Sequence, residues 1–263
     1  MKIGVTQIIL GTMSLDDTLN LCQDAGYETV ELTFRDGKDL NADMSRSEIE
    51  SVGEKCRDAG IEIGSVIASY ADRGNLLSPD AEERESGARS LVRNLEIAGI
   101  LGVSGILLHP GQLTVSDTYQ SVWDNLIGIL KEVTPIAAQN KAAVGLENVW
   151  NKFLLSPKEM REFVDEVGNE WIGVYLDTAN MMAYGYPEHW IRELGTRICR
   201  VHFKDFDRQA HQFVNLLDGD TDWHTVVNEL RAIGYDGPVI HEVGGDHAAQ
   251  VDLAERMRKI VSM

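Results

Sequence analysis

The feature that most constrains the fold of this chain is a regular alternation of short β-rich runs and helical segments. The β-rich runs are KIGVT, TVELTF, IEIGSVIA, GILLHP, AVGLEN, IGVYLD, ICRVHFKD and GPVIHEV. Segments with helical periodicity separate them, at intervals of roughly 30 residues. Eight strand–helix units in about 250 residues are the size and rhythm of a (β/α)8 TIM barrel. We therefore predict an α/β fold with a single barrel domain over residues 1–263.

Helix start and stop signals support this division of the chain. Ser45 and Glu48, three residues apart, have the spacing of a capping box. Ser156 precedes Pro157, and proline is favoured at the first position of a helix. The unit Asp-Ala-Gly, which ends one predicted helix at Gly26, occurs twice before a strand. The competing fold, a doubly wound open sheet, usually carries a glycine-rich phosphate turn after its first strand, and TQIILGTMS contains none.

The composition of the chain indicates which classes of partner and which cellular location to expect. A formal net charge of −18, without a cluster of basic residues, argues against a nucleic-acid partner. No apolar run approaches the roughly 20 residues of a membrane-spanning helix, and the N-terminus is typical of a first strand rather than a secretory signal. The three cysteines, Cys22, Cys56 and Cys199, form no Cys-x-x-Cys pair. We therefore expect reduced thiols, a cytoplasmic location and no membrane association.

Polar residues end four successive predicted strands. In a TIM barrel the active site lies at the carboxyl ends of the strands, and strands five to eight end in Glu147, Asp177, His202 and Glu242. These side chains are typical ligands of a hard or borderline divalent metal ion. Three carboxylates and a histidine that converge without a cation would repel one another. After Asp177 no cationic residue follows until Arg192, so we expect a bound ion, not a basic side chain, to neutralise this aspartate.

Other strand residues give weaker signals. His109 ends the fourth strand and either reaches a substrate or hydrogen-bonds its own loop. Glu31, in the second strand, is expected to contact a neighbouring loop rather than the metal. On the last strand the alternation directs Glu242 inward and His241 toward the helices. Arg200 shares the inward face of its strand with the histidine ligand, and the sequence suggests no role for it.

Five stretches resemble a known superfamily. GLENVWNKF, YLDTANMM, RVHFKDFDR, LLDGDTDW and GYDGPVIHEV resemble the sugar isomerase/epimerase superfamily of xylose-isomerase-like barrels, which includes ketose 3-epimerases and pentulose-5-phosphate 3-epimerases. These stretches cover the second half of the chain closely. The first half resembles the superfamily only in its alternation of strands and helices and in the loop LLHPG. The resemblance implies one divalent ion on Glu147, Asp177, His202 and Glu242. Mn²⁺, Co²⁺ or Mg²⁺ suits this ligand set, and Zn²⁺ is also allowed.

The resemblance extends to positions outside the ligand set. Arg208, six residues after the histidine ligand, corresponds to the family's substrate-binding arginine. Asn180 stands where free-ketose epimerases have a histidine, and is more like the ketose-phosphate enzymes; it is expected to bind a hydroxyl or fix a ligand. Phe153 stands where the free-sugar enzymes have a glutamate. Both departures argue against a free sugar as substrate.

The resemblance implies a mechanism for a small-molecule sugar or sugar phosphate. Glu147 and Glu242 would flank the sugar, one removing a proton and the other returning it to the opposite face. The same residues would serve an aldose–ketose isomerase, and an inosose-type dehydratase also begins with enolisation. Dimers or tetramers are common in the family, so a homodimer or homotetramer is implied.

A phosphate-binding site is left open by the sequence. Barrels often bind phosphate at the loops after strands seven and eight, here KDFDRQAH and VGGDHAAQ. Lys204 and Arg208 supply positive charge, and Gly244-Gly245 permits close approach of a ligand to the backbone. Asp246, at the start of the last helix, is as readily a plain N-cap, which opposes phosphate.

Two alternatives belong to other functional classes. A metal-dependent abasic-site endonuclease of the endonuclease IV type shares this fold, but it needs about nine ligands for three zinc ions. Here Ser69 stands where one of its histidines is expected, and Asn180 replaces another. A non-catalytic sugar-binding barrel is the second alternative, and it would not need two opposed glutamates.

Overall fold

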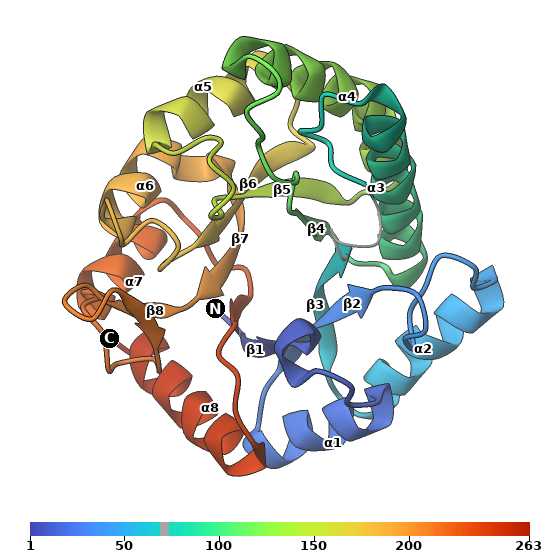
Figure 1. The fold of residues 1–263 in the computed structure, drawn as a ribbon. Helices are drawn as coiled ribbons and strands as arrows, with labels where there is room; N and C mark the ends of the chain where they lie inside the picture. The colour runs from blue at the N-terminus through green and yellow to red at the C-terminus, as the bar shows by residue number, and fades with distance from the viewer. Residues whose placement is uncertain (69–73) are drawn as a thin grey trace.

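The computed structural model describes residues 1–68 and 74–263. Within this part, eight parallel strands close into a barrel in the order β1-β10-β7-β6-β5-β4-β3-β2, with the helices in an outer ring (Figure 1). The barrel strands are β1 (Ile3–Thr6), β2 (Thr29–Phe34), β3 (Glu62–Ala68), β4 (Gly105–Leu108), β5 (Ala143–Glu147), β6 (Ile172–Asp177), β7 (Ile198–Phe203) and β10 (Val239–His241). The predicted TIM barrel is therefore confirmed.

Several helices begin or end at predicted capping residues. They are α1 (Leu15–Ala25), α2 (Arg46–Asp58), α3 (Ala81–Leu101), α4 (Tyr119–Asn140), α5 (Pro157–Val167), α6 (Pro187–Leu194), α7 (Trp223–Ala232) and α8 (His247–Val261), with short 3₁₀ turns at η1 (Gln7–Leu10) and η3 (Gly195–Arg197). Ser45 and Ser156 each form a complete capping box. Gly26 ends α1 in the left-handed conformation at φ 72°, which glycine adopts without strain. By contrast, α2 ends with Ala59 as its C-cap, one residue before the glycine of the second Asp-Ala-Gly unit. Among the described residues, no helix is both long enough and apolar enough to cross a membrane.

The connection from β7 to α7 contains a hairpin that the sequence did not predict. The run ICRVHFKD was expected to be one strand, but it breaks at Lys204 into β7 and β8 (Asp205–Asp207), which pairs antiparallel with β9 (Gln212–Val214). The cause is the buried carboxylate of Asp205. It accepts hydrogen bonds from the backbone N–H of Leu217 at 2.9 Å, the hydroxyl of Thr221 at 2.6 Å and the indole of Trp223 at 3.1 Å. The chain therefore folds around Asp205 instead of extending β7.

The apolar core has two parts. The large part lies between the barrel and the helices. A small separate cluster consists of one residue from each of three strands, Ile67 from β3, Leu107 from β4 and Tyr175 from β6. Tyr175 turns inside the barrel, because its ring centroid lies 4.5 Å from that of His202. Gly145 on β5 makes room beside it, since a Cβ there would lie 3.0 Å from Tyr175 Cβ. The interior is thus filled near its middle and leaves the carboxyl ends of the strands for polar groups.

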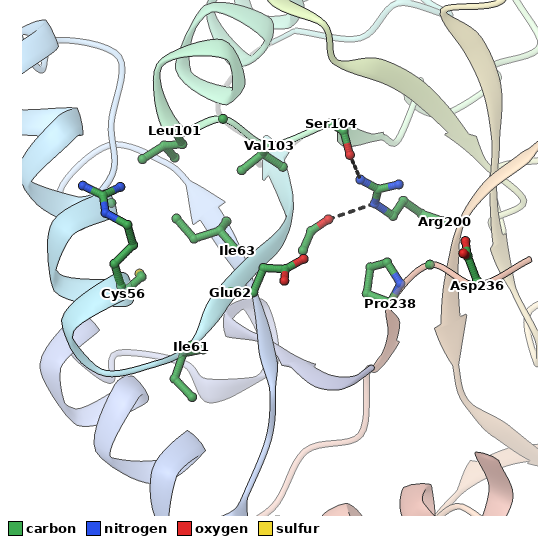
Figure 2. A pocket seen from close by; sticks show the side chains of 15 residues that line it. Cys56, Ile61, Glu62, Ile63, Leu101, Val103, Ser104, Arg200, Asp236 and Pro238 are labelled. Carbon is green, nitrogen blue, oxygen red and sulfur yellow. Dashed lines mark hydrogen bonds between the residues drawn. The ribbon is translucent and has the colours of Figure 1, made fainter. Parts of the chain in front are cut away.

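Arg200 belongs to the opposite end of the barrel from the predicted site. Its guanidinium donates hydrogen bonds to Gly64 O, Cys199 O and Ser104 Oγ, at 2.8, 2.7 and 2.8 Å. Arg200 and Ser104 line a cavity of about 420 Å³. Figure 2 shows both apolar side chains, such as Ile63, and charged ones, such as Glu62 and Asp236, around it. Arg200 therefore links β7 to β3 and to the start of β4, which gives this inward-facing arginine a structural role.

Candidate metal centre and active site

The four predicted ligand residues converge at the carboxyl ends of their strands. One ligand atom from each of Glu147, Asp177, His202 and Glu242 lies within 4.8 Å of the others. The first three side chains are buried, and Glu242 is partly exposed. Strand register explains the convergence. Asp177 is directly opposite His202, whereas His202 pairs with Ile240, so Glu242 stands two residues further, just beyond the end of β10.

Two buried atoms of the cluster lack a hydrogen-bond partner among the described residues. They are Nδ1 of His202 and Oδ2 of Asp177. The other carboxylate oxygen of Asp177 accepts hydrogen bonds from the backbone N–H groups of Ala179 and Asn180, at 2.8 and 2.7 Å. Buried polar atoms are rarely left unpaired in folded proteins. Two atoms of metal-ligating type that lack a hydrogen bond within one cluster fit a divalent cation.

Glu31 contacts the histidine of the cluster, and the prediction that it contacts a neighbouring loop is wrong. Its Oε1 lies 3.1 Å from His202 Nε2, and its Oε2 accepts a hydrogen bond from the Tyr175 hydroxyl at 2.8 Å. Glu31 is fully buried. A carboxylate on one ring nitrogen of a histidine fixes the tautomer that presents the other nitrogen to a metal. Here that other nitrogen is the unpaired Nδ1.

Proximity and burial shift the pKa values of the cluster. Burial, together with the carboxylates of Glu242 and Asp177, raises the pKa of Glu147 to about 8. Burial also raises the pKa of Asp177. For His202, burial alone would lower the pKa, but the charge and hydrogen bond of Glu31 outweigh it and raise the pKa to about 9. The metal-free cluster therefore retains protons at neutral pH that a bound cation would displace.

Lys204 overturns the expectation that no basic side chain reaches Asp177. Its Nζ donates a hydrogen bond to Glu242 Oε2 at 2.8 Å and lies 3.8 Å from Asp177 Oδ2. Thr178 positions this lysine, because its hydroxyl accepts from Lys204 N and donates to Lys204 O. Burial alone would lower the pKa of Lys204, but Asp177 and Glu242 raise it above its ordinary value. The lysine therefore contributes a permanent positive charge at one side of the cluster.

Two asparagines hold the ligand strands together. The side chain of Asn148 accepts a hydrogen bond from Asp177 N at 2.8 Å and donates one to Asp177 O at 3.0 Å. Asn180 donates to Asn148 O at 3.0 Å and to Glu147 Oε1 at 3.4 Å. Asn180 thus contacts Glu147, a predicted metal ligand, and this contact corresponds to one of the two roles expected for Asn180. The sequence analysis missed Asn148, although its place directly after Glu147 was a usable signal.

Arg208 and His109 lie in the loops that surround the cluster. The two Nη atoms of Arg208 donate hydrogen bonds to Met182 O and Gly185 O, both at 2.7 Å, and its guanidinium lies 4.4 Å from the ring centroid of Tyr186. These contacts hold the loop between β6 and α6. His109 Nδ1 accepts a hydrogen bond from the backbone of its own loop at 3.1 Å, and burial lowers the pKa of this histidine.

The remaining sequence candidates are structural or lie outside the described residues. Phe153 is buried among aromatic side chains, with ring centroids of Tyr119 and Phe163 at 5.0 and 6.0 Å. His241 faces the helices as predicted, with Nε2 2.7 Å from the Tyr27 hydroxyl. Ser69, which bears on the endonuclease alternative, lies outside the described residues. Within the described ranges, one cluster of metal-ligating side chains is found.

The chain is similar in sequence or in fold to several known proteins. A putative L-ribulose-5-phosphate 3-epimerase UlaE of Shigella dysenteriae is 22% identical over 235 residues, which are 88% of this chain and 83% of that protein. A solved D-tagatose 3-epimerase-like protein superimposes with a TM-score of 0.85 at 22% identity, covering 100% of this chain and 97% of that one. The IOLI protein, solved with a bound zinc atom, has a TM-score of 0.83 at 18% identity, covering 100% and 98%.

The family model gives the broadest match. The model of the xylose isomerase-like TIM barrel matches residues 19–260, which include all eight helices in part or whole and all four ligand positions. Together with the closed barrel and the Glu/Asp/His cluster at its carboxyl end, this match shows that the chain belongs to the xylose isomerase-like TIM barrel family.

Proposed function

We propose that this protein is a divalent-metal-dependent epimerase or isomerase that acts on a ketose or ketose phosphate. The observation that carries the proposal is the placement of two glutamates in one four-residue cluster. Glu147 ends β5 and Glu242 follows β10, while Asp177 and His202 lie on the two strands between them in the barrel. The 3-epimerases among the relatives and structural neighbours support the same reaction type.

The cluster would hold one metal ion. Glu147, Asp177, His202 and Glu242 are the ligands that we assign, because their unpaired and negatively charged atoms converge. A divalent ion supplies the positive charge that stabilises an enediolate when a proton leaves the neighbouring carbon. An oxygen-rich set with one histidine suits Mn²⁺, Co²⁺ or Mg²⁺, and the zinc of the structural neighbour supports Zn²⁺ as an alternative.

The side chains of the chain itself would move the proton. Of Glu147 and Glu242, one takes the proton from the carbon beside the carbonyl group, and the other returns a proton to the opposite face, which inverts the stereocentre. In the reverse direction the two exchange roles. Asn180 would hold Glu147 in place through its amide, and Lys204 would hold Glu242 in place through the hydrogen bond from its ammonium group.

The other assigned residues would act around the substrate. His109 would contact the sugar from the end of β4. For Arg208 we propose an indirect role, in which the arginine fixes the loop that carries Asn180, because both Nη atoms already donate to carbonyl groups of that loop. The free thiols of all three cysteines support a reducing, cytoplasmic location.

Proton NMR in deuterated water tests the proposal. The metal-reconstituted protein is incubated with a panel of ketoses and ketose phosphates, and paramagnetic metal is removed before the spectra are recorded. We expect deuterium to enter at one carbon of one sugar, with loss of this exchange in the Glu242→Gln variant. Absence of exchange in every sugar, despite one bound metal per chain, would overturn the epimerase proposal. Three metal ions per chain would favour the endonuclease alternative.

A further inference from the structure

A cavity of about 520 Å³ opens beside the cluster, between the hairpin of β8 and β9 and the loop after β10. The residues that line it include Lys204, Phe213, Asn215, Asp218, Glu242 and Gly244. The cavity therefore adjoins two residues of the proposed reaction, and a part of the substrate that extends from the reacting carbons can enter it. Its charges and surfaces indicate which chemical class of substrate it accepts.

We propose that the substrate is an uncharged, unphosphorylated ketose, and that this cavity holds its polyhydroxyl part. The inference rests on the proposed function and specifies its substrate class. A phosphate ester carries a charge of about −1.5 to −2 at neutral pH. Such a group needs donors or cations that are free to meet it, whereas a neutral polyol needs hydrogen-bond acceptors and an apolar surface.

The cations on the segments around the cavity already have anionic or carbonyl partners. Lys204 Nζ lies 2.8 Å from Glu242 Oε2 and 3.8 Å from Asp177 Oδ2, so a phosphate would have to take it from two carboxylates. Arg256 donates to Asp218 Oδ1 at 2.7 Å and to Asp252 Oδ2 at 2.6 Å. Each of these two cations lies beside two carboxylates, so neither one provides excess positive charge for a phosphate.

Arg208 is also unavailable to bind a phosphate, because its guanidinium already has hydrogen-bond partners. Its Nη1 and Nη2 atoms each donate to a backbone carbonyl of the β6–α6 loop, and the face of Tyr186 covers the guanidinium. A phosphate could recruit Arg208 only if that loop gave up its two hydrogen bonds. The two cations that the sequence offered for phosphate, Lys204 and Arg208, are thus both engaged elsewhere.

The start of α8 is closed to an anion by a carboxylate. TIM barrels often bind phosphate at the loops after the seventh and eighth strands, against the start of a helix, where backbone N–H groups point at the ligand. Here Asp246 is the N-cap of α8, and its Oδ1 accepts a hydrogen bond from Ala249 N at 2.9 Å. A negative charge therefore occupies the helix start beside Gly244-Gly245, and it would repel a phosphate.

The surfaces that remain suit a neutral sugar. Phe213 is 39% exposed and offers an aromatic face on which the C–H groups of a sugar can pack. Its ring also lies 4.4 Å from Lys204 Nζ, which keeps the lysine on the side of Glu242. The carboxylate of Asp218 and the amide of Asn215 can accept hydrogen bonds from hydroxyl groups.

Phe153 and Asn180, the two sequence departures that argued against a free sugar, have structural roles that do not depend on the substrate. Phe153 is 2% exposed and packs within the apolar core rather than in the cavity. The amide of Asn180 donates to Glu147 and to Asn148 O, so it serves the cluster. Neither position reports on the presence of a phosphate group.

The test compares each ketose with its own phosphate ester by deuterium exchange, using the metal-loaded protein. We expect kcat/KM for the free ketose to exceed that for its phosphate by at least about tenfold. A phosphate ester that reacts as fast as the free sugar, or faster, overturns the inference but leaves the epimerase function intact. Absence of exchange in every free sugar and every ester refutes both.

A variant of Asp246 tests whether its negative charge causes the discrimination between a free ketose and its phosphate ester. Asp246→Ser keeps an N-cap hydroxyl and removes the carboxylate, so we expect kcat/KM for the phosphate ester to rise several-fold while that for the free ketose stays unchanged. Asp222→Ser, which makes the same change at the start of α7, serves as the matched control and should leave the ratio unaltered. An equal response of both substrates to Asp246→Ser would contradict the inference.

Discussion

The Nε2 atom of His202 on β7 lies 3.1 Å from Oε1 of Glu31 on β2, across the interior of the barrel. Because Glu31 contacts this nitrogen, Nδ1 is the ring nitrogen that remains without a hydrogen-bond partner among the described residues. The two strands are not neighbours in the sheet, so the contact joins distant parts of the chain. The orientation of the only histidine in the cluster therefore depends on a residue outside the ligand set.

Replacing Glu31 should weaken metal binding. We expect Glu31→Gln to lower the affinity for Mn²⁺ or Zn²⁺ by roughly 10- to 100-fold, because the histidine loses a charged partner that orients it and raises its basicity. Isothermal titration calorimetry measures the effect. Tyr175→Phe is the matched control, since it removes one donor to Glu31 but leaves the contact with His202 in place. An affinity in Glu31→Gln equal to that of the wild type would contradict the assignment.

Metal affinity should rise with pH. The pKa of Glu147 is raised to about 8 and that of His202 to about 9, so both groups carry protons in the metal-free protein at neutral pH. A metal ion binds their deprotonated forms, and each proton that must leave costs up to about tenfold in apparent affinity per pH unit below its pKa. Titrations between about pH 6 and 9 should show tighter binding at higher pH. Buffers of different ionisation enthalpy should reveal proton release, and a flat profile would refute this account.

The two glutamates should each be required for turnover, beyond their role in metal binding. With the metal at saturating concentration, we expect Glu147→Gln and Glu242→Gln each to lower kcat by roughly 10²- to 10⁴-fold, because an amide cannot exchange the proton. Glu62→Gln, an exposed glutamate paired with Lys2 at the other end of the barrel, provides the control. Full activity of either cluster variant would exclude a two-base mechanism.

Arg200 should matter for stability and leave the chemistry unaffected. Arg200→Met removes hydrogen bonds to Gly64 O, Cys199 O and Ser104 Oγ, and we expect the free energy of unfolding to fall by about 2–4 kcal/mol. Urea unfolding measures this change. Arg46→Met, which breaks an exposed pair with Glu50, should cost less than about 1 kcal/mol. A loss of metal affinity in Arg200→Met, with stability retained, would place Arg200 in the site instead.

The sequence by itself determined the barrel and the position of the cluster. Eight β-rich runs separated by capped helices leave few topologies other than a closed parallel barrel, because parallel strands need helical crossovers that cover the sheet. In such a barrel all carboxyl ends meet at one edge. Glu147 and Asp177 end their strands, and His202 and Glu242 lie within one residue of a strand end, so their convergence follows from local pattern alone.

The tertiary structure decided which other side chains reach the cluster. Glu31 and His202 are 171 positions apart, and Lys204 meets Glu242 only because the chain breaks from β7 at that residue. Irregular register, as between Val30 and Glu31 in the pairing of β2 with β3, also displaces one strand relative to its neighbour. Local periodicity specifies the face on which a residue lies, but contacts across the barrel depend on the stagger of all eight strands together. For that reason the sequence predicted the four residues that converge, and only the fold revealed Glu31 and Lys204 beside them.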